Sequence, residues 1–338
     1  EACNNERLTE GILRCLLEYF PDAASAIAEG DRTPLHIICF NKNVTRGMVQ
    51  LLIDACPESI NRADNDGWTP LHILCSNTDL DDNAAVDILG LLLERCPEAV
   101  QRTGIYGRLP IHAAAGQGSK SVEFCRTLIE AYPGSERMAA PRDGLPFHTA
   151  CGRNTVAVAE YLYKLYPEGM NVAAGNGGYY PILYAIEGLA LRTNPDSAIE
   201  MVQFLLDCNP NAVLHKYDGN LPLYWACRLF YVAYERSNAK VNAAVKTAQV
   251  LYDARPEAII EDGDIARDLR TFPEEIQTFI NTHLNLARLA RNSTARQMKK
   301  RDENGQLPLH QALRDNISLG SIKLLVKRNP SVVLTPDN

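Results

Sequence analysis

The tetrapeptide Thr33-Pro34-Leu35-His36 returns unchanged at residues 69–72, and this repetition decides the fold. Altered copies occupy residues 109–112, 145–148 and 307–310, and weaker copies occupy 180–183 and 221–224. The prolines of these copies follow one another at intervals of 35 to 41 residues, apart from a last gap of 86. Since that gap is about twice one interval, we expect a degenerate copy inside it, with Ala266 in the place of the proline.

A second proline closes an apolar run within each interval, as Pro57 does after Leu51 and Leu52. It lies 13 residues before the proline of the next tetrapeptide in four consecutive copies, whereas its distance from the proline of the preceding tetrapeptide ranges from 21 to 34 residues. A link of constant length is typical of a fixed structural piece, and the variable part indicates an exposed loop that tolerates insertions. Three long insertions, at residues 76–85, 187–197 and 229–244, are therefore candidates for partner specificity, although the last could equally be a helix packed on the array.

Each unit is predicted to be two helices joined by a turn. Proline is favoured at the first position of a helix, and Met48, Leu52 and Ala55 follow helical spacing before Pro57 ends the second helix. Because one helix pair cannot bury its apolar face alone, we predict an all-α solenoid of stacked helix–turn–helix repeats with short hairpin or turn links. It forms a single array over residues 1–338, with a truncated repeat over 1–30 and further repeats that start near residues 34, 70, 110, 146, 181, 222, 266 and 308.

Residues 64–72, which read Asp-Asn-Asp-Gly-Trp-Thr-Pro-Leu-His, resemble the ankyrin repeat, and the resemblance recurs along nearly the whole chain. The units are longer than the roughly 33 residues of the family. Pro-Glu-Ala also stands where the family has a glycine after the second helix, and the Gly-His pair between the helices is absent. These departures concern the turn between the helices and the hairpin links, and they leave the helix pair intact.

The resemblance implies a scaffold that binds a partner protein through the turn tips and the exposed face of the first helices. The positions that correspond to these surfaces are Phe40, Trp68, Tyr106, Arg108, Arg153, Tyr179, Asn220, Arg228, Gln306 and Arg314, together with Ser76, Gly116, Gly152 and Glu187. Aromatic residues and arginine are the residue types that most often anchor interfaces. The alternative for Trp68 and Tyr179 is that each packs on its own hairpin.

Pairs such as His36 with Cys39 and His72 with Cys75 share a helix face and could suggest a metal site or a catalytic dyad. They recur once per repeat, however, and His112 is followed by Ala115 in the place of the cysteine. A catalytic site occurs once, whereas a structural residue recurs with the unit. We therefore interpret the histidines as structural, bonded to neighbouring backbone, and expect no catalytic residue, cofactor or metal.

Residues 276–301 contain no acidic side chain and carry six basic ones. One hypothesis is a basic amphipathic helix that contacts an acidic partner, a membrane surface or nucleic acid. The other, which the spacing of Ile276, Phe279, Ile280 and Leu284 favours, is the second helix of the seventh repeat, with its apolar face on the core.

The whole chain has 338 residues and a net charge of −7, which argues against a nucleic-acid binder. No segment is apolar enough to span a membrane, and the ten cysteines fall mostly within apolar helical patterns, which favours a reduced intracellular, cytoplasmic protein. We expect a monomer. Because the chain begins at Glu1 without methionine, an alternative is that it is the regulatory or targeting arm of a larger enzyme or channel.

Overall fold

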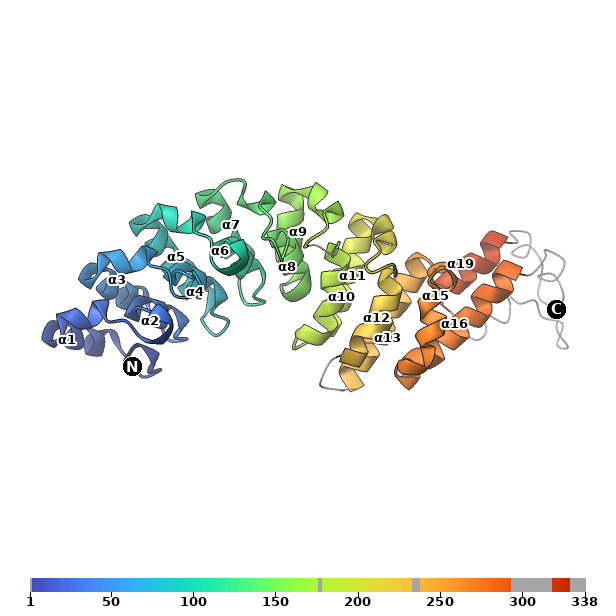
Figure 1. Ribbon diagram of the computed structural model, residues 1–338, viewed down its shortest axis with the longest axis horizontal. Coiled ribbons are helices and arrows are strands. Elements are labelled where there is room, and N and C mark those ends of the chain that lie inside the picture. Colours follow the sequence, from blue (N-terminus) through green and yellow to red (C-terminus); the bar gives the residue numbers. More distant parts are fainter. Residues whose placement is uncertain (1, 176–177, 233–237, 293–317, 329–338) are drawn as a thin grey trace. The chain divides into compact units, whose positions relative to one another are not determined.

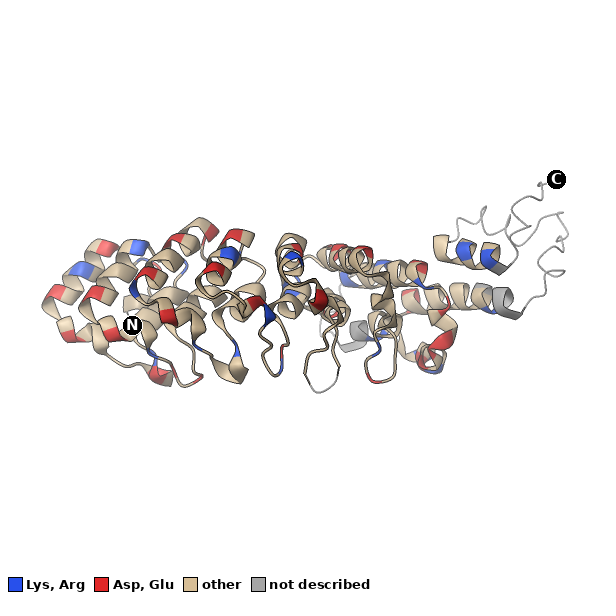
Figure 2. Cartoon of the chain, turned by 90° about the horizontal axis from the view of Figure 1, so that it is seen from above, with Lys and Arg blue, Asp and Glu red and all other residues tan. Residues whose placement is uncertain are grey.

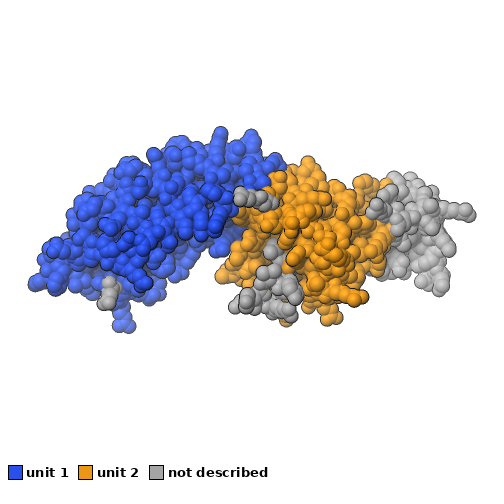
Figure 3. Space-filling model, in the orientation of Figure 1, with its two compact units in different colours: residues 1–177 blue, residues 178–338 orange. Residues whose placement is uncertain are grey.

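The computed structural model describes residues 2–175, 178–232, 238–292 and 318–328. The chain divides into two compact units, residues 1–177 and residues 178–338 (Figure 3). The described residues contain helices and isolated β-bridges but no β-strand, so the predicted all-α class is confirmed. The expected hairpin links are reduced to single bridges, such as that between Ala28 and Arg32.

Two rows of helices build the first unit (Figure 1). The inner row consists of α2 (Pro34–Phe40), α4 (Pro70–Ser76), α6 (Pro110–Ala115) and α8 (Pro146–Arg153). The outer row consists of α1 (Glu10–Tyr19), α3 (Arg46–Ala55), α5 (Asp82–Arg95), α7 (Val122–Ala131) and α9 (Val156–Leu165). Each inner helix contacts the next inner helix, and each outer helix contacts the next outer helix. The unit is therefore a stack of helix pairs, as the repeat predicts.

Local sequence signals set the helix boundaries. Each inner helix begins at the proline of its tetrapeptide. The outer helices begin after a capping side chain: Thr45, Ser121 and Thr155 each accept a hydrogen bond from the backbone N–H three residues later. The second proline opens a short 3-10 helix, as in Pro57–Asn61, one residue after the outer helix has ended. It thus starts the link to the next repeat as well as ending the helix.

The core lies between the two rows. Inner helices bury leucine, isoleucine and cysteine side chains, including Leu35, Ile38 and Cys39 of α2. Acidic and basic side chains are interspersed along the helices of this unit and do not gather by sign (Figure 2). The helix pairs are therefore held together mainly by apolar burial, and the polar groups that are buried with it need partners of their own.

A row of asparagines that the sequence analysis missed supplies those partners at the C-terminal ends of the inner helices. The side chain of Asn77, just after α4, donates through Nδ2 to the carbonyl oxygen of Cys39 in the preceding repeat at 3.0 Å. Its Oδ1 accepts from the backbone N–H groups of Asp79 and Leu80. Asn41 and Asn154 occupy the same place after α2 and α8 and also donate to backbone carbonyls of the preceding segment. Each asparagine therefore links one repeat to the one before it.

The third repeat has Gln117 at that position, and a lysine takes over the bond to the preceding repeat. Lys120 is almost completely buried, and its Nζ donates to the carbonyl oxygen of Asn77 at 2.6 Å. The ammonium also lies over the ring of Phe124, 5.4 Å from its centroid. Burial lowers the pKa of Lys120. A buried lysine here shows that the carbonyl groups of the preceding repeat require a donor, whichever residue supplies it.

The second unit repeats the helix pair in a less regular form. Its helices are α10 (Pro181–Leu191), α11 (Asp196–Cys208), α12 (Pro222–Val232), α13 (Asn238–Ala254), α14 (Ala258–Glu261), α15 (Gly263–Asp268), α16 (Glu274–Asn292) and α19 (Leu319–Arg328). Ala266, expected in the place of a motif proline, lies in the middle of α15, which instead begins after the capping side chain of Asp262. The repeat start near residue 308 lies outside the described residues.

The asparagine row generates a stability prediction. Replacing Asn77 with alanine leaves the carbonyl of Cys39 and two backbone N–H groups without their partner, so we expect Asn77→Ala to lower the free energy of unfolding by about 1–3 kcal/mol. The matched control is Asn65→Ala, at an exposed turn position. Urea unfolding followed by circular dichroism measures both, and equal midpoints for the two variants would contradict the role assigned to Asn77.

Candidate functional site

The four histidines of the first unit are bonded at both ring nitrogens. Nδ1 of His36, His72, His112 and His148 accepts from the backbone N–H three residues earlier, at 3.1 to 3.3 Å. Because an amide N–H can only donate, Nδ1 carries no proton, and Nε2–H is the donor. Nε2 then donates to a carbonyl oxygen of the link to the next repeat, at 3.0 Å for Trp68 and 3.1 Å for Arg108.

In this geometry the histidines of the histidine–cysteine pairs have no ring nitrogen available for metal binding or proton transfer. Cys39 and Cys75 are completely buried, and burial raises the pKa of Cys39 to about 12, so that the reactive thiolate is suppressed. Among the described residues no group of histidine, cysteine and carboxylate side chains could hold a metal ion. The interpretation of these histidines as structural is consistent with every one of their hydrogen bonds.

At the start of α12 in the second unit, other residues make the hydrogen bonds that a histidine makes in the first unit. In α12 the position of the histidine is occupied by Tyr224, whose hydroxyl donates to Asp268 of the next repeat at 2.8 Å. The backbone N–H of Leu221, which a histidine would have accepted, donates to the buried side chain of Asp262 at 2.9 Å. Two acidic residues of the following repeat thus replace one imidazole.

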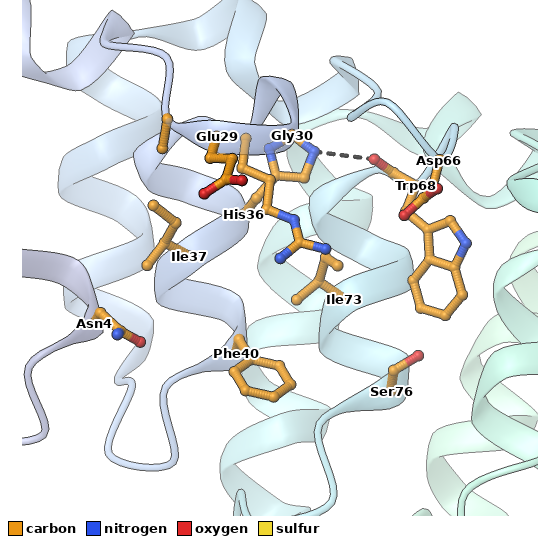
Figure 4. Close-up of a pocket in the computed structure, with 12 residues that line it drawn as sticks. Asn4, Glu29, Gly30, His36, Ile37, Phe40, Asp66, Trp68, Ile73 and Ser76 are labelled. Carbon is orange, nitrogen blue, oxygen red and sulfur yellow. Dashed lines mark hydrogen bonds between the residues drawn. The ribbon is translucent and has the colours of Figure 1, made fainter. Parts of the chain in front are cut away.

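The candidate binding site is a groove of about 850 Å³ on the inner helices of the first unit (Figure 4). Its helical side is formed by Ile37 and Phe40 of α2 and by Ile73 and Ser76 of α4. These residues stand three and six positions after the motif prolines, on the face that does not pack against the outer row. The remaining lining residues are Asn4, Ala28, Glu29, Gly30, Arg32, His36, Asp66 and Trp68.

Three predicted residues, Phe40, Trp68 and Ser76, lie together in this groove. The side chain of Phe40 is 63% exposed although it is large and apolar. Trp68 is half-buried, and its backbone N–H is bonded to Asp64. Its indole lies against Gly104 of the next link, where a Cβ would come within 2.9 Å of the ring. Trp68 therefore packs partly on the next link and lines the groove as well, whereas Phe40 is mostly exposed.

The groove is confined to the first two inner helices. The positions equivalent to Ile37 and Phe40 hold Ala113 and Gly116 in α6, and Thr149 and Gly152 in α8. Small residues there leave no side chain that could anchor a partner. The large apolar residues of this inner face are thus concentrated in α2 and α4.

Three other predicted residues of the first unit lie on a link or at the end of an inner helix. Tyr106 is 45% exposed, and the guanidinium of Arg142 lies over its ring, 4.0 Å from the centroid. Arg108 is engaged by Asp143 of the next link in two hydrogen bonds, one of them 2.6 Å long. Arg153 is exposed at the end of α8. None of the three lines the groove.

Three predicted residues of the second unit take part in its own packing. The ring of Tyr179 lies edge-on to Tyr184 and to Tyr217, with centroids 5.0 and 4.8 Å away, which matches the hairpin-packing alternative. Asn220 is buried, and its side chain bonds within its own turn. Arg228 is exposed, with its guanidinium 5.6 Å from the ring centre of Trp225. Gln306 and Arg314 lie outside the described residues.

The basic segment begins as a packed helix. In α16 the apolar residues Ile276, Phe279, Ile280 and Leu284 are buried, and the helix contacts α13, α14 and α19. This is the arrangement expected for the second helix of a repeat. Residues 293–301, which hold four of the six basic side chains, lie outside the described residues. No helix of the described part is long and apolar enough to cross a membrane.

Sequence reasoning missed most of the groove lining. Ile37 and Ile73 could have been found, because they stand at one repeated position, three residues after the motif proline. Glu29, Arg32 and Asp66 carry no such signal, since their place on the groove depends on how the links fold over the helices.

Comparison with known proteins identifies the repeat. A family model described as three copies of the ankyrin repeat matches residues 1–94. The human ASB11 ankyrin repeat domain is similar at 20% identity and a TM-score of 0.44, over 70% of this chain and 94% of that chain. The ankyrin repeat domain of Bcl-3, a member of the IkappaB protein family, is similar at 18% identity and a TM-score of 0.47, over 75% of this chain and all of that chain. No curated protein matches the sequence. The predicted ankyrin repeats are thus confirmed over residues 1–94, which include the groove.

The histidines generate a prediction of pH dependence. Burial lowers the pKa of His72, His112 and His148 to about 4, below the unfolded value of about 6.5. The unfolded chain therefore binds protons that the folded unit excludes, so the stabilisation is full above about pH 6.5 and is lost as the pH falls toward 4. Each of the three histidines should lower the free energy of unfolding by about 1.4 kcal/mol when the pH falls from about 7.5 to 5.5.

Urea unfolding at these two pH values measures the effect in the natural chain and in a His112→Gln variant. The variant is less stable at both, but we expect its loss of stability on acidification to be smaller by about 1.4 kcal/mol. An unchanged pH dependence in the variant would show that His112 is not excluded from protonation in the folded unit.

Proposed function

We propose that this chain is a scaffold that binds a partner protein through the groove between α2 and α4, with Phe40 as its central anchor. Ankyrin repeats as a class mediate protein–protein interactions, and stacked repeats present extended concave surfaces suited to this task. The observation that carries the proposal is the exposure of Phe40 inside a groove whose other apolar residues, Ile37 and Ile73, are also at its surface or just beneath it.

The exposed phenylalanine has no structural purpose among the described residues. The other side chains of α2 stabilise the stack: Leu35, Ile38 and Cys39 are buried, and His36 bonds to the next link. Exposed aromatic side chains in a concavity are the residues that most often dominate the binding energy of an interface. A partner that covers Phe40 would remove its ring from water, and this burial of apolar surface would contribute favourable free energy to binding.

The neighbouring links extend the proposed surface. Tyr106, Arg108 and Arg153 lie on the same unit and would contact a partner longer than the groove. Arg108 is already bonded to Asp143, so its replacement would disturb the link itself. Phe40 is the cleaner position for an experiment, because no hydrogen bond or ring contact of its side chain holds the fold together among the described residues.

We also propose that the protein works as a binding module without a catalytic step, in a reducing intracellular compartment such as the cytoplasm. The ten cysteines are all free, and eight of them are buried. Unpaired buried cysteine is typical of proteins that fold where thiols stay reduced.

The test is affinity capture from an extract of the native cells, with the natural chain, a Phe40→Ala variant and a Met138→Ala control. Met138 is also apolar and exposed in the same unit but does not line the groove. We expect a partner retained by the natural chain and by the control to bind the Phe40→Ala variant about 30-fold more weakly, which is the usual loss at an aromatic hot spot. Retention of the same partner at full strength by Phe40→Ala contradicts the groove as the binding site.

A further inference from the structure

The groove carries an uncompensated negative charge on the side of the links. Three charged side chains line it: Glu29, Arg32 and Asp66. Arg32 donates through Nε to the buried carboxylate of Asp64 at 3.3 Å, so its positive charge is offset within the protein. Glu29 and Asp66 are exposed and form no ion pair with any described residue. The links therefore present two free carboxylates to whatever occupies the groove.

The charged and apolar parts of the groove are separated in space. Figure 4 shows Glu29 and Asp66 on the link side, whereas Phe40 and Ser76 lie toward the other end of the two inner helices. Ile37 and Ile73 lie between these ends. An occupant thus meets apolar side chains along the helices and, toward the links, the carboxylates of Glu29 and Asp66.

We infer that the groove takes a segment of a partner protein in which a lysine or arginine stands near a large apolar side chain. The apolar side chain would cover Phe40 and the isoleucines, and the cation would lie between Glu29 and Asp66. An acidic segment is disfavoured, because it would bring like charges together at the links. This inference rests on the proposed function, and it adds the chemistry of the partner to the location of the site.

The two carboxylates are suited to this role because they are not needed by the fold. The side chain of Asp66 makes no hydrogen bond in its turn, which instead uses the carboxylate of Asp64 to accept from the N–H groups of Asp66 and Trp68. Glu29 is exposed and its side chain is likewise unbonded among the described residues. Both can therefore be neutralised, as Glu29→Gln and Asp66→Asn, without loss of a contact that stabilises the unit.

The experiment is a selection from a random peptide library on the intact chain and, in parallel, on the Phe40→Ala variant. Sequences enriched by the natural chain but not by the variant define the groove ligands. We expect them to combine a large apolar residue with a nearby lysine or arginine. The strongest of these peptides is then synthesised, and its affinity is measured for the natural chain, for the Glu29→Gln/Asp66→Asn double variant and for a Glu18→Gln control.

Glu18 is an exposed carboxylate of α1 that does not line the groove. Affinity should fall about five- to tenfold in the double variant at low salt and stay unchanged in the control, since exposed charge pairs are each worth a modest amount. The difference should shrink as salt screens the charges.

The outcomes separate this inference from the function on which it rests. Peptides that depend on Phe40 but are acidic or lack basic residues, or an affinity that the double variant retains, overturn the charge inference and leave the groove in place. A selection that gives no Phe40-dependent sequence overturns the groove itself, and with it the proposed function.

Discussion

The rest of the structure depends on one constraint: the ends of a short buried helix must find hydrogen-bond partners outside that helix. The inner helices of the first unit are only six to eight residues long, so most of their backbone groups belong to a first or last turn. Each helix is also enclosed by its neighbours, which keeps water from many of these groups. Leaving a buried amide or carbonyl unpaired costs more than a typical hydrogen bond contributes, so every end needs a side chain that reaches it.

Two rows of side chains meet this requirement, one at each end of the inner helices. Histidines at the N-terminal ends bind a backbone N–H of their own repeat and a carbonyl of the next link. Asparagines at the C-terminal ends bind carbonyls of the preceding repeat. Because both rows join one repeat to another, the hydrogen bonds that complete a helix also set the spacing of the stack. The same requirement explains Lys120 in the third repeat and the Asp262–Leu221 bond in the second unit, where the usual residue is missing.

Because these residues stabilise the ends and the buried face of each inner helix, the opposite face is available for binding. The ends are held by histidine and asparagine, and the buried face is held by leucine, isoleucine and cysteine. The side chains at positions three and six after the proline differ in size between repeats. They are large and apolar in α2 and small in α6 and α8, which confines the groove to the start of the array. The carboxylates of Glu29 and Asp66 are free for the same reason, since the turns are stabilised by Asp64 and by backbone bonds.

The amino-acid sequence by itself determined the repeat, the helix pair and the structural character of the histidines. These follow from local rules: proline opens a helix, helical spacing marks a buried face, and a residue that recurs with every unit serves the unit. The repeat position of Phe40 also indicates the face of its helix on which it lies, whereas its role in binding stays a prediction. Only the tertiary structure decided which residues meet across repeats. The acceptor of Asn77 is Cys39, 38 residues earlier in the chain, and the indole of Trp68 rests on Gly104, 36 residues later. Glu29 and Asp66 likewise come from different links. Periodicity gives the face of a helix on which a residue lies, but it carries no information on the side-chain contacts that form when one repeat is stacked on the next.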